Sequence, residues 1–340
     1  MIAKSVMALL IGFCFSMIFG IIIIPLLKRI KADQTISIYL NKEHRNKEGT
    51  PTLGGIIFIL PTIVIMMILL LTNKIHFSYT LVIIIFTLIS YFLIGFVDDL
   101  IIIKKHNNVG LTISSKLIMQ FIVAIIFFYL FMKGGNEPLL WIHTIHFKLN
   151  IGFLYGLFIL FLLVASSNAV NITDGLDGLA AGLSIIGFIT FGIISWNTGW
   201  LDGYEDIAVM AFILSGCLLG FLVFNINPAK VFMGDTGSLA LGATLGAYAI
   251  MTRHELLLAL IGLVFVIETI SCIVQIVYFR LTNKRLFPMT PIHHTFEKNG
   301  MRENEIVRLF WLIGLICSFI SLIYGVILWK RKWSLYGLVL

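Results

Sequence analysis

Long hydrophobic runs separated by short polar segments dominate the chain. A helix needs about 20 mostly apolar residues to cross the hydrocarbon core, and lipid offers its backbone no hydrogen-bond partners. Ten runs fit this description, at about 5–27, 54–73, 79–97, 112–132, 151–167, 178–196, 207–224, 237–251, 256–279 and 307–329. The pattern therefore predicts an all-α, polytopic integral membrane protein with about ten transmembrane helices, in a single domain over residues 1–340.

The polar clusters that could support chemistry each follow an odd-numbered run. Asp98 and Asp99 follow the third run, a segment rich in Asn and Asp follows the fifth, Asp235 follows the seventh, and His293 follows the ninth. A chain that crosses a bilayer repeatedly returns to the same side after every second crossing. Parity alone therefore predicts one composite site on one face of the membrane.

Composition and charge support a membrane protein and suggest its orientation. The 340 residues are 59% hydrophobic and only 12% charged, about half the charged fraction of a soluble domain. Two thirds of the 24 Lys and Arg residues lie in the loops after odd-numbered runs. Cytoplasmic loops carry such an excess, so we expect the motif face in the cytoplasm and both termini outside. The net charge of +7 suits anionic lipid and phosphate-bearing substrates. It is spread over several loops, so we expect no nucleic-acid partner.

Adjacent carboxylates end the third run at Asp98 and Asp99. Acidic residues near the membrane are costly and are functional hypotheses by default. Paired carboxylates suit Mg²⁺, a hard cation that proteins hold with one or two carboxylates and phosphate oxygens. A plain polar helix end is the alternative.

The segment from Ser167 to Leu179 is denser in polar groups. Asn168, Asn171 and Asp174 recur at every third position, so they share one face of a helical end, and Asp177 extends the series. Gly175 permits a tight turn or a close approach of ligand. A helix–turn–helix with Asn and Asp as caps would need fewer such residues.

Asp235 opens the eighth run and has two interpretations. It could cap that helix, because Asp is a preferred N-cap residue. Beside two other acidic clusters on the same face, a role as metal ligand is favoured. Phe232, three residues earlier, could stack on a nucleobase or anchor the chain at the membrane surface.

Histidines and lysines supply candidate phosphate ligands. His293 and His294 lie in the last loop on the motif face, with no Cys nearby, so phosphate contact is preferred over zinc. His44 and a turn rich in glycine, Gly49–Gly55, lie in the first loop. The cationic candidates on this face are Lys47, Lys104, Lys105 and Lys116. Mg²⁺ ligands and phosphate binders together indicate phosphoryl transfer, which depends mostly on positioning and charge neutralisation. The apolar bulk indicates a lipid substrate.

These motifs closely resemble the polyprenyl-phosphate N-acetylhexosamine-1-phosphate transferase superfamily, and within it the phospho-N-acetylmuramoyl-pentapeptide transferase family. The resemblance covers nearly the whole chain, and its motifs occur in the same order as in the family. The matching segments are GTPTLGG at Gly49–Gly55, Asp98-Asp99, Gly110-Leu111 with Lys116, SNAVNITDGLDGLA at Ser167–Ala180, Asn225, VFMGDTGSLALG at Val231–Gly242 and PIHHTFE at Pro291–Glu297.

The resemblance implies a reaction and its partners. Undecaprenyl phosphate attacks the sugar-linked phosphate of UDP-MurNAc-pentapeptide, UMP leaves, and lipid I forms, a step of peptidoglycan synthesis in the bacterial inner (cytoplasmic) membrane. Mg²⁺ is the implied cofactor, the bilayer is a partner, and a homodimer is left open.

The resemblance also implies site residues. The expected catalytic residues are Asp98, Asp99, Asp174, His293 and His294. The expected metal ligands are Asp235 and Asp174. The expected substrate-binding residues are Lys47, Lys116, Asn168, Asn171, Asp177, Asn225 and Phe232. Asp98 is implied as a base or nucleophile, and Phe232 as the contact to uracil.

One position departs from the family. The family loop usually has three successive histidines, and here the third position is Thr295. A threonine hydroxyl can hydrogen-bond a phosphate oxygen or a neighbouring imidazole but carries no charge. This leaves His293 and His294 as the candidate imidazoles in that loop.

Two other functions would also use acidic motifs in a membrane protein. A sister transferase moving a simpler N-acetylhexosamine 1-phosphate would share the Asp motifs, but the Pro291–Glu297 loop argues against it. A divalent-cation transporter would place its acids near the bilayer midplane, whereas these acids cluster at one face.

Overall fold

The computed structural model describes residues 2–30, 32, 47, 49–105, 109–142, 147–199 and 201–327. His44 and several of the counted lysines and arginines lie outside these ranges.

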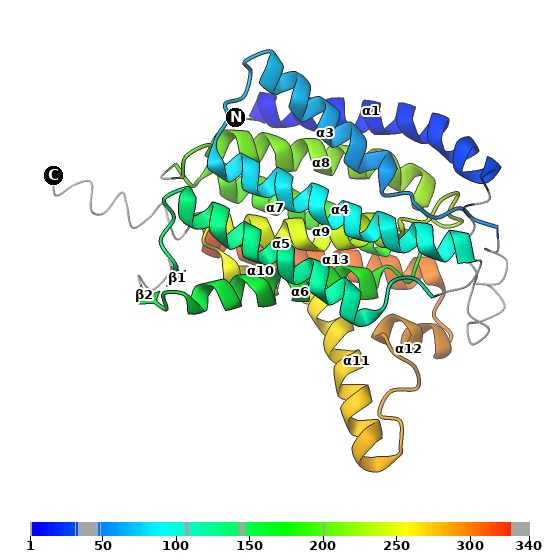
Figure 1. Ribbon diagram of the computed structural model, residues 1–340. Coiled ribbons are helices and arrows are strands. Elements are labelled where there is room, and N and C mark those ends of the chain that lie inside the picture. The colour runs from blue at the N-terminus through cyan, green and yellow to red at the C-terminus, as the bar shows by residue number, and fades with distance from the viewer. Residues whose placement is uncertain are drawn as a thin grey trace.

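Helices make up nearly all of the regular structure, in a layered bundle (Figure 1). They are α1 (Ile2–Arg29), α3 (Ile56–Leu71), α4 (Tyr79–Lys105), α5 (Ile113–Lys133), α6 (Leu154–Thr173), α7 (Leu179–Trp196), α8 (Tyr204–Asn225), α9 (Gly234–Met251), α10 (Glu255–Ile261), α11 (Leu263–Thr282), α12 (Ile292–Lys298) and α13 (Glu303–Leu322), which continues as a π-helical turn at Ile323–Ile327.

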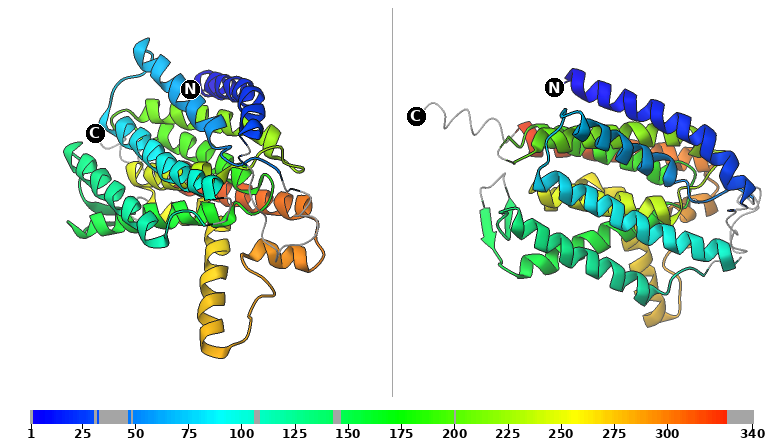
Figure 2. Two further views of the ribbon diagram at one scale, coloured as in Figure 1. Left: turned by 45° about the vertical axis from the view of Figure 1, so that its right-hand side comes forward. Right: turned by 45° about the horizontal axis from the view of Figure 1, so that its top comes forward.

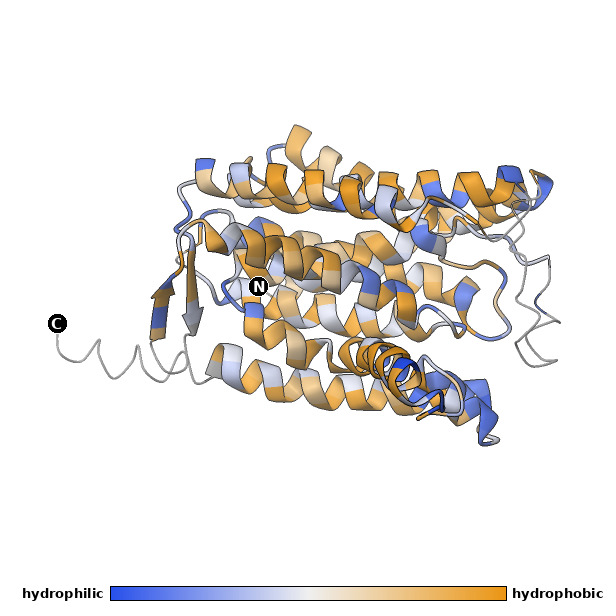
Figure 3. Cartoon of the chain, turned by 60° about the horizontal axis from the view of Figure 1, so that its bottom comes forward, coloured by the Kyte–Doolittle hydropathy of each residue, from blue (hydrophilic) through white to orange (hydrophobic). Residues whose placement is uncertain are grey.

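The helices confirm an all-α, multi-pass membrane protein. Within the described residues, eight helices are long and apolar enough to span a membrane: α1, α4, α5, α6, α7, α8, α11 and α13 with its π-helical extension. The apolar α3 is shorter, and α9 is buried along nearly its whole length. Hydrophobic residues make up most of the length of the helices, and hydrophilic residues are concentrated near the helix ends and in the loops (Figure 3).

Two features differ from the pattern expected from the sequence. The run expected at 256–279 is interrupted at Gly262, which separates α10 from α11. Glycine is a poor helix former, and α11 leaves the bundle at this point (Figures 1 and 2). A short antiparallel hairpin, β1 (Leu139–Ile142) with β2 (Phe147–Asn150), joins α5 to α6, with Leu139 opposite Asn150.

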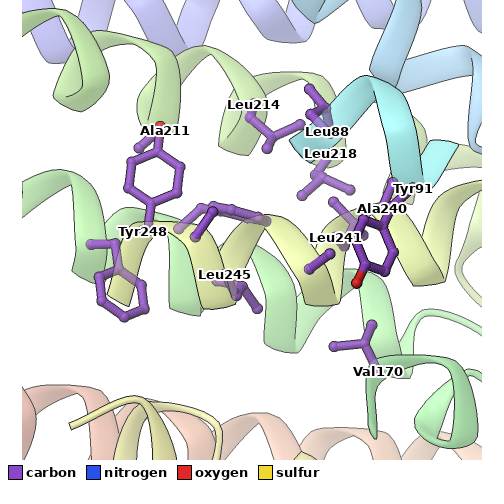
Figure 4. Close-up of a cluster of buried hydrophobic side chains, with 14 of the residues drawn as sticks. Leu88, Tyr91, Val170, Ala211, Leu214, Leu218, Ala240, Leu241, Leu245 and Tyr248 are labelled. Atoms are coloured by element: carbon purple, nitrogen blue, oxygen red, sulfur yellow. The ribbon is translucent and has the colours of Figure 1, made fainter. Parts of the chain in front are cut away.

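Helix α9 lies in the middle of the bundle, packed between α4, α6, α7 and α8. Tyr91 of α4 and Val170 of α6 lie near Leu241 of α9, and Tyr248 of α9 lies beside Ala211 of α8; all five are fully or almost fully buried (Figure 4). These contacts fix the ends of α4, α6 and α8 relative to the start of α9.

Glycines allow α9 to lie unusually close to its neighbours. A Cβ atom at Gly95 of α4 would lie 2.0 Å from the carbonyl oxygen of Asp235, and one at Gly242 would lie 2.2 Å from that of Ser166 on α6. Any larger residue would push the helices apart. The close approach brings the ends of α4 and α6 to the first turn of α9, where the acidic motifs lie.

Candidate active site

A lysine bridges two of the predicted carboxylates. Lys116 Nζ, in the first turn of α5, lies 2.6 Å from Asp235 Oδ2 and 3.3 Å from Asp98 Oδ2. Asn171 Nδ2 donates to Asp235 Oδ1 at 2.7 Å, and the backbone N–H of Leu111 donates to Asp98 Oδ1 at 2.7 Å. Residues from α4, α5, α6 and α9 therefore meet in one cluster, which we call the acid–lysine centre: Asp98, Lys116, Asn171 and Asp235.

The turn before α5 positions Lys116. The Thr112 side chain caps α5 by accepting a hydrogen bond from Ser115 N at 3.2 Å. Just upstream, a Cβ at Gly110 would lie 2.6 Å from Asp98 Oδ1. Glycine at this position therefore lets the backbone lie against the Asp98 carboxylate.

The carboxylate of Asp99 points away from this centre, into the start of α9. It accepts hydrogen bonds from Asp235 N at 3.2 Å, Thr236 N at 2.9 Å and Thr236 Oγ1 at 2.6 Å. The two N–H groups are orphan donors of the first turn of α9, so Asp99 acts as a helix cap supplied by another helix. Gly234, at φ +72°, approaches Asp99 so closely that a Cβ would lie 2.4 Å from Oδ2.

This arrangement excludes the first of the two interpretations of Asp235, the helix cap. Its carboxylate contacts Lys116 and Asn171 rather than the N–H groups of its own helix, which Asp99 binds instead. Asp235 is therefore not the N-cap of α9, and its oxygens face the other site residues.

Asn168 lies one turn deeper along α6 than Asn171. Its Nδ2 donates to Val164 O at 2.8 Å and to Gln120 Oε1 of α5 at 3.3 Å. Asn168 therefore links α6 to α5 inside the bundle, and a substrate contact for it stays a prediction.

Asp174 follows the last residue of α6. Burial raises the pKa of its carboxyl well above the usual range, and the negative charges of Asp235, Asp99 and Asp177 raise this pKa further. Four carboxyl groups thus influence one another at this end of the bundle. A cation placed among them would favour the charged form of Asp174.

A second cluster joins the segment before α3 to the Asp-rich turn and to the start of α13. We call it the Lys47 cluster: Lys47, Asp177, Asn227 and Glu303. Lys47 Nζ lies 2.7 Å from Asp177 Oδ1 and 2.7 Å from Glu303 Oε1. Asp177 Oδ2 accepts from Asn227 Nδ2 at 3.1 Å and from Ala229 N at 3.0 Å. Sequence reasoning found Lys47 and Asp177 but missed Asn227 and Glu303.

Asn225 joins two loops. It is 3% exposed; its Oδ1 accepts from Gly178 N at 3.1 Å, and its Nδ2 donates to Val231 O at 3.0 Å. Phe232 follows, and its backbone N–H donates to Pro51 O at 2.8 Å. This contact ties the loop before α9 to the glycine-rich turn of residues 49–55.

The two histidines of the last loop lie together, with ring centroids 4.1 Å apart. His293 is fully buried, and its Nδ1 lies 3.1 Å from Glu268 Oε2, a partner in α11 that sequence reasoning missed. Its Nε2 faces the Asp-rich turn, where a Cβ at Gly175 would lie 2.5 Å from that atom. His294 Nδ1 lies 2.6 Å from Glu297 Oε2.

The Thr295 hydroxyl hydrogen-bonds the backbone of Met289. Its Oγ1 donates to Met289 O at 2.5 Å and accepts from Met289 N at 3.4 Å. The hydroxyl therefore closes the loop that precedes the histidines, and a contact to phosphate or imidazole stays a prediction.

The donor set fits Mg²⁺ better than a transition metal. In the described residues, no three His, Cys, Asp or Glu side chains converge as a metal cage. Mg²⁺ needs no such cage, because it is held by one or two carboxylates with phosphate oxygens and water. The Lys116 ammonium already lies between two carboxylates, which indicates that this position favours positive charge.

Comparisons with known proteins agree with the motifs and the fold. Residues 80–253 match the profile of glycosyl transferase family 4. A phospho-N-acetylmuramoyl-pentapeptide-transferase of Geobacillus sp. is 43% identical over 93% of this chain and 96% of its own length. Those of Staphylococcus epidermidis and Staphylococcus saprophyticus are 45% and 44% identical, each over 95% of this chain and 98% of their own lengths. The chain therefore belongs to the phospho-N-acetylmuramoyl-pentapeptide-transferase family.

Proposed function

We propose that this protein transfers phospho-N-acetylmuramoyl-pentapeptide from UDP-MurNAc-pentapeptide to undecaprenyl phosphate, which releases UMP and forms lipid I for peptidoglycan synthesis. The observation that carries the proposal is the acid–lysine centre, in which Lys116 joins Asp98 to Asp235 at one end of a membrane-spanning bundle. A diphosphate donor and a lipid phosphate both require such a place, where charge is neutralised at the edge of an apolar core.

Mg²⁺ is the proposed cofactor. Asp235 and Asp174 would hold it, because both present carboxylate oxygens near the other acids of the motif end. When bound, Mg²⁺ would neutralise charge on the phosphate oxygens of the donor. Asp99 would contribute by fixing the backbone of Asp235 and Thr236.

The residues of the acid–lysine centre would position the two phosphates. A phosphate monoester has a second pKa of about 6, so the lipid phosphate is largely a dianion at neutral pH and already a nucleophile. The role of Asp98 would then be to orient Lys116, and that of Lys116 to attract phosphate. We propose a single displacement in which the lipid phosphate attacks and UMP leaves.

The second cluster and the last loop would bind the rest of the donor. Lys47 and Asp177 would frame the nucleotide together with Asn171 and Asn225, and Phe232 would stack on uracil. His293 and His294 would contact phosphate or sugar; His293 Nε2 is buried beside the Asp-rich turn and has no hydrogen-bond partner in the described ranges.

The protein would lie in the bacterial cytoplasmic membrane with its site facing the cytoplasm. The excess of Lys and Arg after the odd-numbered runs supports this orientation. It puts the site on the side where nucleotide-linked donors are made, and both termini outside.

The test is product formation by purified protein in detergent. With UDP-MurNAc-pentapeptide, undecaprenyl phosphate and Mg²⁺, we expect UMP release together with a lipid-linked muramoyl product identified by mass spectrometry. Chelation of Mg²⁺ should stop both signals, and added Mg²⁺ should restore them. UMP release without a lipid-linked product would contradict the proposal.

A further inference from the structure

Glu303 holds the Lys47 cluster together. It is the first residue of α13, and its Oε1 accepts from Lys47 Nζ at 2.7 Å and from the backbone N–H of Asp177 at 2.7 Å. Its Oε2 accepts from Lys47 Nζ at 2.9 Å and from Asn227 Nδ2 at 2.8 Å. One carboxylate thus binds three segments that are far apart in the sequence.

Capping of α13 does not account for this side chain. Arg302 is the N-cap residue, and Glu305 completes its capping box by accepting from Arg302 N at 3.1 Å. Glu303 instead points away from its own helix, and its side chain is only 11% exposed. A carboxylate buried to this degree is costly unless it is paired and fully hydrogen-bonded, and here both oxygens are.

The same contacts determine where the Lys47 ammonium lies. It contacts Asp177 Oδ1 and both oxygens of Glu303. Without Glu303, the ammonium would keep one carboxylate partner, and both Asp177 N and Asn227 Nδ2 would lose an acceptor. The Asp-rich turn after α6 and the loop before α9 would keep their direct contacts through Asp177 Oδ2, but both would lose their common link to Lys47 and α13.

We infer that Glu303 is a positioning residue for the nucleotide part of the donor, acting through Lys47 and Asp177. The inference rests on the proposed function, because it assumes a uridine-diphosphate donor at these loops. Glu303 makes no contact with Asp98, Lys116 or Asp235 within the described structure. Its loss should therefore weaken donor binding while leaving the phosphate chemistry and the lipid acceptor site nearly intact.

The experiment compares Glu303→Gln with Glu305→Gln. The control removes the same charge two residues away, where the Arg302–Glu305 pair lies at the surface. We expect Glu303→Gln to raise the donor KM and the UMP dissociation constant by about 10-fold to 100-fold, because charged, buried hydrogen bonds are lost. The kcat and the KM for undecaprenyl phosphate should stay within about threefold, and Glu305→Gln should behave as wild type.

A double-mutant cycle tests whether Glu303 acts through Lys47. If it does, Lys47→Met combined with Glu303→Gln should raise the donor KM by clearly less than the product of the two single effects. Fully multiplicative effects would overturn the inference, as would a Glu303→Gln variant that lowers kcat alone.

Folding and function are separated by two further measurements. Glu303→Asp keeps the charge but is one methylene shorter, so it cannot hold all three segments and should show an intermediate UMP dissociation constant at wild-type thermal stability. Wild-type UMP affinity in this folded variant would overturn the inference. If the wild-type protein binds UMP but does not use the muramoyl donor, the proposed function fails while the role of Glu303 is still measured by UMP titration.

Discussion

The contrasting contacts of Asp98 and Asp99 predict that equivalent substitutions will have different effects. Asp99→Asn removes the charge from a buried cap that serves two N–H groups and one hydroxyl at the start of α9. Asparagine keeps one acceptor oxygen and turns an NH₂ group towards the remaining donors. At least one hydrogen bond to a charged group is lost, at about 1.5–3 kcal/mol.

This loss should appear as instability. At roughly 2–4 °C for each kcal/mol, the apparent Tm should fall by about 3–12 °C. Turnover should fall too, because the backbone of Asp235 is released. Asp98→Asn keeps an acceptor for Leu111 N and loses only its charge beside Lys116. It should therefore lower kcat with little change in Tm.

The assay is thermal unfolding in detergent, followed by intrinsic fluorescence, with kcat measured on the same preparations. An Asp99→Asn variant that keeps the wild-type Tm while losing turnover would show that the Asp99 carboxylate does not stabilise α9. Asp99 would then belong among the groups that contact the reacting atoms. An Asp98→Asn variant that unfolds as early as Asp99→Asn would equally contradict the assignment.

Further substitutions test other parts of the site. Asp235→Asn should abolish turnover and flatten the Mg²⁺ dependence; normal activity across a Mg²⁺ titration would exclude Asp235 as a ligand. Gly110→Ala should lower kcat by up to about 100-fold, because the new Cβ displaces the Asp98 carboxylate; unchanged kinetics would show that the turn yields freely. Thr295→Ala should cost one loop hydrogen bond, roughly 0.5–1.5 kcal/mol, whereas His293→Ala should reduce kcat/KM far more; equal effects would make this loop structural. Incubation with donor in the absence of lipid should leave Asp98 unmodified by mass spectrometry, and a phosphosugar adduct on it would disprove a single displacement.

Much of the fold could be predicted because long apolar runs have few alternatives in lipid. Each predicted run corresponds to a helix or, for 256–279, to two helices. The helix break at Gly262 was not predicted, because a glycine within a hydrophobic run leaves the mean hydropathy nearly unchanged. Only the packing of neighbouring helices determines whether the chain bends there.

The gathering of the polar clusters at one end of the bundle was predictable for the same reason. Odd-numbered runs end on one face, and the structure brings Asp98, Lys116, Asn171 and Asp235 into contact there. Which acid points into the centre was not predictable, because neighbouring positions of a helix point in different directions. Asp99 therefore serves α9 while Asp98 serves Lys116.

The missed residues lacked a local signal. Glu303 begins a helix, where an acidic residue is ordinary because of the helix dipole, and Glu268 lies alone within an apolar run. Their partners, Lys47 and His293, are distant in the sequence. For Thr295, nothing in the sequence indicated the hydrogen bond that its hydroxyl makes to the backbone of Met289.

Discrimination between two nucleotide-sugar donors is the sharpest test of the assigned reaction. The measurement is kcat/KM for UDP-MurNAc-pentapeptide and for UDP-GlcNAc, with undecaprenyl phosphate and Mg²⁺ at fixed concentrations and purified wild-type protein. We expect efficient transfer from the muramoyl donor and little or none from UDP-GlcNAc. A preference for UDP-GlcNAc would make the protein a sister hexosamine-1-phosphate transferase, and no transfer from either donor would contradict the assigned reaction.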